Sequence, residues 1–244
     1  MQPVSHLKKM LLIVEGNMGA GKSTFLSILK NRLNLDIIYE PTDKWQQVGA
    51  DGNLLDLFYK DTKRWAYTFQ SFAFITRIQA VLDALKKKEA KELQVLERSV
   101  YCDRFCFAKN CYESGTMSSL EWQIYKDWFA WLVEGYTQRP DGFVYLKTSP
   151  NTCYDRMKKR DRSEEKEVPL SYLELLHKKH EDWLVAKTET IDYIKNVPVL
   201  TLDCDLEFES NKEEQEKHIK AVEVFINEIK GRYIIPAKQE QLHL

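Results

Sequence analysis

A glycine-rich stretch near the start of the chain, residues 16–23, constrains the fold more than any other feature. It reads Gly-Asn-Met-Gly-Ala-Gly-Lys-Ser and fits the G-x-x-x-x-G-K-[ST] pattern at every fixed position. An apolar run at residues 10–14 leads into it, and apolar spacing over residues 25–33 indicates a helix after it. Because strand, glycine loop and helix in this order bind phosphate, we predict a nucleotide site here.

The chemistry of the loop suggests a role for each part. Its glycines let backbone N–H groups converge on an anion, and the N-terminus of the next helix adds favourable partial charge. We expect Lys22 to reach the outer phosphates and the Ser23 hydroxyl to ligate Mg²⁺. The residues expected to bind ATP here are Gly16, Asn17, Met18, Gly19, Ala20, Gly21, Lys22, Ser23 and Thr24.

Length and composition restrict the possible classes of protein. A chain of 244 residues fits one α/β domain, which we place at residues 1–244. The net charge of -1 argues against general affinity for nucleic acid or anionic membranes, so we expect neither as a partner. No apolar run approaches the length of a membrane span, and residues 1–10 are too short and polar for a signal peptide.

The cysteines indicate the compartment. There are five, an odd number, and no C-x-x-C pair occurs, which supports neither a disulfide framework nor a zinc site. Cys102 and Cys106 would share a helix face, and we interpret them as buried small residues rather than metal ligands. We expect a cytoplasmic location, although a truncated start could hide a mitochondrial import signal.

Short apolar runs alternate with long helical patterns, which predicts a parallel sheet flanked by helices. The candidate strands are residues 11–15, 37–39, 93–97, 143–146 and 199–202. Ligands of such sheets gather at the carboxyl ends of the strands, where this chain places several acidic residues. These are Glu15, Glu40, Glu97 and Asp203.

Two of these acidic residues suggest specific chemistry. Pro41 disfavours helix at Glu40, so we interpret Glu40 as a general base in preference to a solvated loop glutamate. Glu97 could stand opposite Ser23 and help to hold Mg²⁺. A loop over residues 203–208 could lie beside the adenine of ATP, which makes Asp203 and Phe208 candidates for ATP binding.

Residues 63–88 read as a long helix with an apolar stripe. The stripe contains Trp65, Phe69, Phe72, Ile75, Ile78, Leu82 and Leu85. Gln70, Ala73 and Arg77 fall on a different stripe, which could cradle a planar polar group. Periodicity alone favours an ordinary polar helix face for these three residues.

A capping box at Ser118 and Glu121 opens another helix, which we expect to end near Tyr136. Its large apolar residues exceed one buried stripe, so either neighbouring helices or a second subunit should cover it on more than one side. The second alternative predicts a homodimer. The helix that Pro169 opens contains His177 and His180, which we interpret as packing or surface residues rather than catalysts.

A basic cluster occupies residues 156–162 and predicts a lid at about residues 156–168. Arg156 and Arg160 lie i, i+4 on a helix, so both guanidinium groups can reach one side. A solvated surface is the alternative for an isolated cluster. Beside a phosphate loop, planar guanidinium groups suit the charge that spreads over a transferring phosphoryl group. The acidic pair Glu164 and Glu165 could accept hydrogen bonds from a sugar hydroxyl.

Together these motifs resemble the deoxyribonucleoside kinase family, especially its deoxycytidine and deoxyguanosine kinases. The resemblance runs from about residue 13 to about residue 208. The matching stretches lie at residues 15–24, 40–45, 68–71, 97–104, 156–165 and 172–184. Several independent motifs in the same order are more specific than the phosphate loop alone.

The resemblance implies an α/β P-loop kinase with a five-stranded parallel sheet and a short arginine-rich lid. Such an enzyme phosphorylates the 5′-hydroxyl of deoxyribonucleosides with ATP or another nucleoside triphosphate and Mg²⁺, in nucleotide salvage. Glu40 matches the general base, and Arg98 matches the residue that contacts the 5′-oxygen and keeps Glu40 ionised. The residues expected to bind or neutralise the phosphates are Lys22, Arg156, Arg160 and Arg162, and those expected to hold Mg²⁺ are Ser23 and Glu97.

The resemblance also implies an acceptor pocket. Tyr59 and Glu165 match the pair that grips the sugar 3′-hydroxyl, and Gln70 and Asp103 match the residues that read the base. The remaining residues expected to bind the deoxynucleoside, besides Glu40 and Arg98, are Trp45, Leu55, Phe58, Phe69, Ala73, Arg77 and Phe107.

Arg77 and Asp103 favour deoxycytidine, deoxyadenosine and deoxyguanosine over thymidine, because thymidine-preferring relatives carry smaller or apolar residues at these positions. A thymidine-preferring kinase is one alternative. A nucleoside monophosphate kinase is another, although it would need a cationic site for the phosphate of its acceptor. A regulator that binds nucleotide without catalysis is an alternative of a different class.

Overall fold

The computed structural model describes residues 10–50, 52–86 and 91–234. The chain divides into two compact units, Met1–Asp205 and Leu206–Leu244. The family resemblance and the single domain expected at residues 1–244 run across this boundary, and the single domain stays a prediction. The end of the helix expected at residues 63–88 lies outside the described residues.

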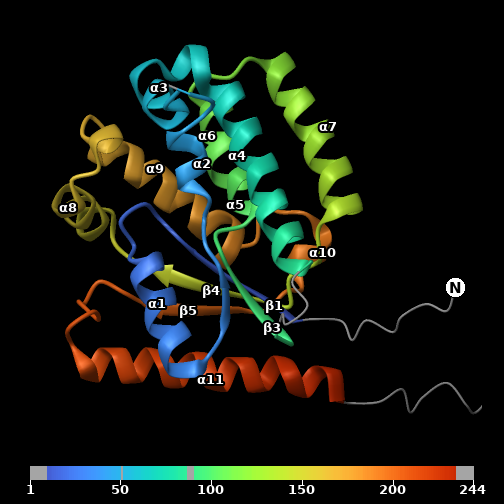
Figure 1. Cartoon of the computed structure of the whole chain (residues 1–244), viewed down its shortest axis with the longest axis vertical. Helices are drawn as coiled ribbons and strands as arrows, with labels where there is room; N and C mark the ends of the chain where they lie inside the picture. The colour runs from blue at the N-terminus through green and yellow to red at the C-terminus, as the bar shows by residue number, and fades with distance from the viewer. Residues whose placement is uncertain (1–9, 51, 87–90, 235–244) are drawn as a thin grey trace, which may run out of the picture. The chain divides into compact units, whose positions relative to one another are not determined.

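A five-stranded parallel sheet forms the centre of the first unit, which confirms the predicted fold class (Figure 1). The strands are β1 (Met10–Gly16), β2 (Asp36–Ile38), β3 (Leu93–Glu97), β4 (Gly142–Lys147) and β5 (Val199–Asp203), in the order β2-β3-β1-β4-β5. All neighbouring pairs run parallel. The three central strands are buried almost throughout, which explains why their sequences are continuous apolar runs instead of alternating patterns.

Helices fill the connections between the strands. Their bounds in the first unit are α1 (Lys22–Leu33), α2 (Thr42–Gln46), α3 (Leu54–Lys60), α4 (Thr62–Leu85), α5 (Val100–Cys102), the π-helix η1 (Asp103–Ala108), α6 (Lys109–Glu113), α7 (Ser119–Tyr136), α8 (Pro150–Arg160), the 3₁₀-helix η2 (Ser163–Glu165), α9 (Leu170–His180), the π-helix η3 (Glu181–Val185) and α10 (Asp192–Lys195). The helix α11 (Lys212–Ile234) belongs to the second unit. In the first unit α1 packs against β1, β2 and β3, and α4 contacts both β2 and α7.

The phosphate loop connects β1 to α1. Two features of the structure require glycine at position 19 of this loop. Its φ of +75° is a conformation that side chains rarely adopt. A Cβ atom there would lie 2.1 Å from the carbonyl oxygen of Cys153 in α8. The loop is therefore packed tightly against the helix that leads to the lid.

The helix α4 buries the face that periodicity assigned to solvent. Gln70 and Arg77 are each 1% exposed, whereas Ile75, expected in the apolar stripe, is 43% exposed. The interpretation of an ordinary polar face is therefore wrong. Arg77 tolerates burial because it pairs with Asp103 and Glu40.

The helix α7 begins with the predicted capping box between Ser118 and Glu121. One side of the helix is buried, through residues such as Trp122 and Phe129. Large side chains on its other side stay exposed, and we call Leu120, Ile124, Trp128, Trp131 and Tyr136 the aromatic face. Within the described part of the first unit, neighbouring helices therefore cover α7 on one side only.

The cysteines all lie within the described residues, where each is free and buried. Cys102 and Cys106 are completely inaccessible, as we expected of small buried residues. Among the helices that the structure describes, none combines the length and the apolar character needed to cross a membrane.

Candidate active site

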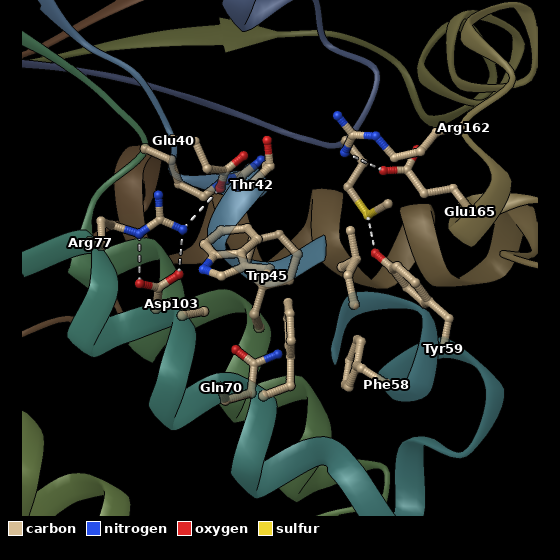
Figure 2. A pocket seen from close by; sticks show the side chains of 16 residues that line it. Glu40, Thr42, Trp45, Phe58, Tyr59, Gln70, Arg77, Asp103, Arg162 and Glu165 are labelled. Atoms are coloured by element: carbon tan, nitrogen blue, oxygen red, sulfur yellow. Dashed lines mark hydrogen bonds and ion pairs between the residues drawn. The ribbon is translucent and has the colours of Figure 1, made fainter. Parts of the chain in front are cut away.

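A pocket lies beside segments that follow the carboxyl ends of β1, β2 and β3 (Figure 2). All the residues predicted to bind the deoxynucleoside line it: Glu40, Trp45, Leu55, Phe58, Tyr59, Phe69, Gln70, Ala73, Arg77, Arg98, Asp103, Phe107 and Glu165. They come from segments spread over more than half of the chain. The fold thus brings the separate motifs of the sequence to one place.

Aromatic rings form one wall of the pocket. The rings of Phe58 and Phe69 stack with their centroids 4.6 Å apart. The edge of Trp45 meets Phe69 at a centroid distance of 5.6 Å, and its Nε1 donates to Thr76 Oγ1 at 2.9 Å. These contacts fix flat apolar surfaces suited to a planar ring.

A buried ion pair faces these rings. Arg77 donates from Nε to Asp103 Oδ2 at 2.8 Å and from Nη2 to Asp103 Oδ1 at 3.0 Å. Burial raises the pKa of Asp103 to about 6, although the nearby Arg77 opposes this rise. The carboxylate therefore remains ionised at neutral pH and can accept hydrogen bonds from a ligand.

Glu40 stands between two guanidinium groups. Its Oε1 atom lies 2.9 Å from Arg77 Nη2 and 3.1 Å from Arg98 Nε. Burial alone would raise the pKa of Glu40, but Arg77, Arg98 and Lys22 lower it to about 2. An ionised carboxylate with this support can orient a hydroxyl and accept its proton.

Arg98 adopts an unusual backbone conformation directly after β3. Its φ is +59°, and its N–H donates to the carbonyl oxygen of Val14 at 3.0 Å. Its guanidinium also lies over the ring of Phe107, 4.7 Å from the centroid. Such strain persists only where surrounding contacts over-determine the conformation.

The donor side is formed by the phosphate loop. Lys22 Nζ donates to the carbonyl oxygens of Gly16 at 3.0 Å and Asn17 at 2.8 Å. Burial, followed by the charge of Arg98, lowers the pKa of Lys22 to about 8, so Lys22 is still mostly charged at neutral pH. Asn17 is buried and donates from Nδ2 to Leu173 O in α9 at 2.9 Å.

Ser23 and Glu97 lie in contact, with Ser23 Oγ donating to Glu97 Oε1 at 2.6 Å. They come from α1 and from the end of β3, respectively. A hydroxyl and a carboxylate are hard oxygen ligands, which fit the preference of Mg²⁺.

The lid is held together by Glu165. Both Arg160 and Arg162 pair with its carboxylate, the second at 3.0 Å. Figure 2 shows Arg162 and Glu165 on the side of the pocket opposite Arg77. Nearby, Tyr59 donates from its hydroxyl to Met18 Sδ at 3.5 Å.

Comparison with known proteins assigns this geometry to a family. The family model described as deoxynucleoside kinase matches residues 12–227. The chain belongs to the deoxynucleoside kinase family. It is 40% identical to deoxycytidine kinase of Mus musculus, over 91% of this chain and 92% of that protein. It is also 40% identical to deoxycytidine kinase 2 of Gallus gallus (87% and 89%) and 38% identical to mitochondrial deoxyguanosine kinase of Xenopus laevis (88% and 89%).

As a member of this family the protein is a kinase, which takes a phosphoryl group from a nucleotide donor and acts on a nucleoside. Within this deoxynucleoside kinase, three pocket residues were not expected to bind the acceptor: Met18, Thr42 and Arg162, the last of which was assigned to the phosphates of the donor. Met18 was assigned only to the phosphate loop, and Thr42 was not singled out. Thr42 follows Glu40 and Pro41 directly, and this closeness is the signal that could have identified it.

Two residues of the first unit that were predicted to bind ATP, Arg156 and Asp203, do not line the pocket. Arg156 donates to the carbonyl oxygens of Cys204 at 2.8 Å and Asp205 at 3.2 Å, unlike Arg160, which pairs with Glu165. Asp203 ends β5 and accepts from the Asp205 N–H at 3.1 Å. Phe208 belongs to the second unit, so it is not among the residues that the structure brings together here.

The two neighbouring lid glutamates have different partners. Glu165 lines the pocket, whereas Glu164 does not. Instead, Glu164 Oε1 accepts from Gln46 Nε2 at 2.9 Å and from Asn53 Nδ2 at 2.7 Å. Of the two, only Glu165 is placed to meet a ligand in the pocket.

Proposed function

We propose that this chain phosphorylates the 5′-hydroxyl of deoxyribonucleosides with ATP or another nucleoside triphosphate. Deoxycytidine, deoxyadenosine and deoxyguanosine are preferred over thymidine. The observation that carries this proposal is the position of Glu40. It is ionised, it lies at 2.9 Å and 3.1 Å from two guanidinium groups, and it lines the same pocket as the predicted base-reading residues.

The reaction needs a proton acceptor next to the attacking oxygen. Glu40 takes the proton of the 5′-hydroxyl as that oxygen bonds to the γ-phosphorus. The bond from the γ-phosphorus to the bridging oxygen breaks, leaving a nucleoside diphosphate and a deoxynucleoside 5′-monophosphate. Arg98 contacts the 5′-oxygen and keeps Glu40 ionised.

The phosphates are held from two sides. Lys22 and the N–H groups of the loop bind the donor, and Arg160 and Arg162 reach it from the lid. Arg156 contributes from the base of the lid. Ser23 and Glu97 would hold Mg²⁺, which neutralises charge on the donor phosphates. Asp203 contributes to the adenine side.

Recognition of the acceptor is divided between sugar and base. Tyr59 and Glu165 bind the 3′-hydroxyl. Gln70, Arg77 and Asp103 meet the polar edge of the base between the aromatic rings. Because the charged pair is buried, a base that leaves it unmatched is penalised, which disfavours thymidine.

One assay separates this proposal from its alternatives. ATP consumption is measured with each of the four natural deoxynucleosides and then with their monophosphates. We expect the highest kcat/KM with deoxycytidine or a purine deoxynucleoside. A clear thymidine preference contradicts the base assignment, and turnover of monophosphates alone indicates a monophosphate kinase. Nucleotide binding without any consumption indicates a regulator.

We also propose that the protein is a cytoplasmic homodimer without nucleic-acid or membrane partners. The exposed aromatic face of α7 supports a second copy as partner. The net charge of -1 and the free cysteines suit a small-molecule enzyme in a reducing compartment. One relative is named as mitochondrial, so fractionation of cells expressing the full chain is the appropriate test.

A further inference from the structure

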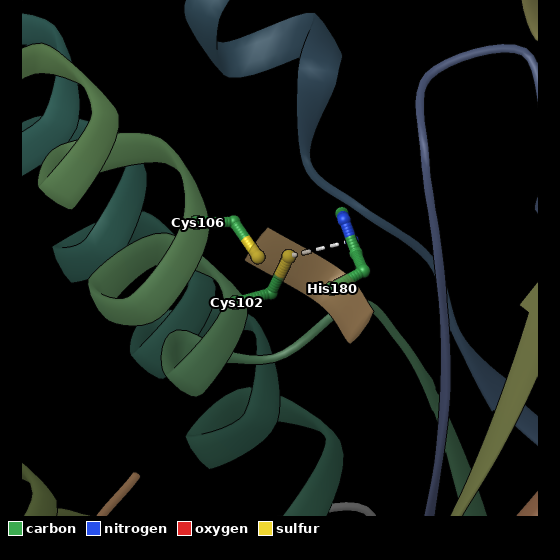
Figure 3. Close-up of side chains that lie close together, drawn as sticks. All are labelled: Cys102, Cys106 and His180. Carbon is green, nitrogen blue, oxygen red and sulfur yellow. Dashed lines mark hydrogen bonds between the residues drawn. The ribbon is translucent and has the colours of Figure 1, made fainter. Parts of the chain in front are cut away.

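A cluster of Cys102, Cys106 and His180 lies completely buried beside Arg98 (Figure 3). The two sulfur atoms and a ring nitrogen lie within 4.8 Å of one another. Cys102 ends α5, Cys106 lies in η1, and His180 ends α9. Segments far apart in the chain therefore meet next to an arginine of the pocket.

The contact between Arg98 and Cys102 links the cluster to the reacting groups. Arg98 Nη1 donates to Cys102 Sγ at 3.1 Å, while Nε of the same guanidinium faces Glu40 Oε1 at 3.1 Å. Arg98 also has the strained φ of +59°. The guanidinium is thus held by Glu40 in the pocket and by the fully buried Cys102.

His180 has a defined orientation toward Cys102. Its Nδ1 lies 2.7 Å from the carbonyl oxygen of Leu176, which can only accept, so Nδ1 carries a proton. Nε2 then faces Cys102 Sγ at 3.4 Å, and one proton is shared between them. Burial alone would raise the pKa of the Cys102 thiol. The Cys106 thiol and the charges of Arg98 and His180 outweigh burial and lower it well below its usual value.

We propose that Cys102, backed by His180, is a positioning residue for phosphoryl transfer: its sulfur accepts a hydrogen bond from Arg98 and fixes the guanidinium that meets Glu40. The proposal rests on the function proposed above for Arg98 and Glu40. Cys102 touches no substrate, so its effect reaches the reaction only through Arg98.

The same residue types could form a site for a thiophilic metal ion, but the surroundings oppose this. The positively charged Arg98 guanidinium lies 3.1 Å from the Cys102 sulfur and donates a hydrogen bond to it. This bond occupies a lone pair of the sulfur that a metal ion would need. Glu15 is the nearby acid, and its own pKa is raised well above its usual value because it is fully buried. The contacts therefore fit an acceptor for arginine better than a cation site.

The test compares three variants of the full chain by initial rates, with ATP and deoxycytidine each varied while the other is saturating. Cys102→Ala removes the acceptor, and we expect kcat to fall about tenfold while both KM values change less than about twofold. Cys102→Ser supplies an oxygen acceptor and should retain most of the wild-type kcat. Cys204→Ala removes another buried thiol, outside the cluster, and should stay close to wild type. Thermal unfolding of each variant checks the fold, and Cys102→Val replaces Cys102→Ala if the latter does not fold.

A double-mutant cycle tests whether Cys102 acts through Arg98. In an Arg98→Lys background, Cys102→Ala should lower kcat by less than about twofold. Equal losses in the two backgrounds, an unchanged kcat in Cys102→Ala, or one equivalent of tightly bound metal in the purified wild type would each overturn the proposal. A wild-type enzyme that turns over no deoxynucleoside would instead contradict the proposed function.

Discussion

Glu40 pairs with two buried arginines, Arg77 and Arg98, and Arg77 also pairs with Asp103. Arg77, Arg98 and Lys22 lower the pKa of Glu40 to about 2 against the effect of burial. Removing this charge should remove the proton acceptor while leaving the pocket walls in place. We expect Glu40→Gln to lower kcat about a thousandfold, as loss of a general base does. Steady-state kinetics with deoxycytidine measure the change.

Asp43 offers a matched control for this substitution. It lies three residues away, at the exposed surface of α2. Asp43→Asn should leave kcat unchanged, and both variants should unfold at temperatures close to that of the wild type. A Glu40→Gln enzyme with more than about a tenth of the wild-type kcat would refute the assignment of the base.

Asp103 predicts a pH dependence of binding. Burial raises its pKa to about 6, so the carboxylate form prevails above pH 6 and is lost as the pH falls below it. If the ionised form reads the base, kcat/KM for deoxycytidine should fall about tenfold between pH 7.5 and pH 5. Asp103→Asn should have a lower kcat/KM that does not change between pH 7.5 and pH 5. A flat wild-type profile would show that ionisation of Asp103 does not control recognition.

At the scale of single residues, sequence patterns identify which residues belong to the site better than they identify which residues each of them contacts. Periodicity treats Arg77 as a surface residue because its contacts with Asp103 and Glu40 depend on the fold. The family resemblance placed Arg77 and Asp103 near the base, but it gave no contact between Arg77 and Glu40. Glu164 and Glu165 are identical in type and adjacent in sequence. Only the three-dimensional path of the lid shows that the first binds Gln46 and Asn53 and the second faces the pocket.

At the scale of elements, Gly19 allows the phosphate loop to pack against α8. The phosphate pattern leaves this position variable, yet a Cβ atom there would lie 2.1 Å from Cys153 O in α8. We expect Gly19→Ala to displace the loop or α8, lower the midpoint of thermal unfolding and raise KM for ATP at least tenfold. Calorimetry and initial rates over a range of ATP concentrations measure these effects.

Gly135 is the appropriate comparison for a glycine-to-alanine change. It lies in α7, where a Cβ atom would meet nothing within 4 Å. Gly135→Ala should therefore be neutral or stabilise the protein by about 0.5–1 kcal/mol, because alanine favours helix. Equal behaviour of the two variants would argue against the tight contact at Gly19.

Glu164 anchors the lid to the segments that wall the pocket. Its pKa is lowered to about 2 because hydrogen bonds from Asn53, Gln46 and Ser163 outweigh the effect of burial. We expect Glu164→Ala to lower kcat/KM about tenfold and to expose the lid to trypsin, since hydrogen bonds to a charged group are lost. The exposed Glu167 in the same lid provides the control, and Glu167→Ala should change neither quantity.

The elements themselves were largely predictable from the sequence. Each strand differs from its expected bounds by no more than one residue at either end. Parallel strands buried on both faces produce continuous apolar runs, and the capping box of α7 is a local signal. The π-helix η1, which carries Asp103 and Phe107, has no such signal, because its widened turn depends on packing around the pocket.

At the scale of the whole molecule, the aromatic face of α7 predicts association of two chains. Trp131 is 56% exposed, and its ring lies 5.9 Å from that of Trp128. A charge placed there should oppose burial against a second copy. We expect light scattering to give twice 28.8 kDa for the wild type and a monomer for Trp131→Glu.

Leu175 provides the control for this substitution. It is 49% exposed on α9 rather than on α7. The Leu175→Glu variant should therefore have the same mass by light scattering as the wild type. A monomeric wild type, or a Trp131→Glu variant of undiminished mass, would contradict the assignment of this face as an interface.

The pairing of Arg160 and Arg162 with Glu165 links two parts of the proposed active site. Both guanidinium groups contact the carboxylate that is expected to bind the sugar. One side chain therefore touches both the residues proposed for the donor phosphates and the space proposed for the acceptor. A substitution of Glu165 should accordingly raise KM for the deoxynucleoside and for ATP together.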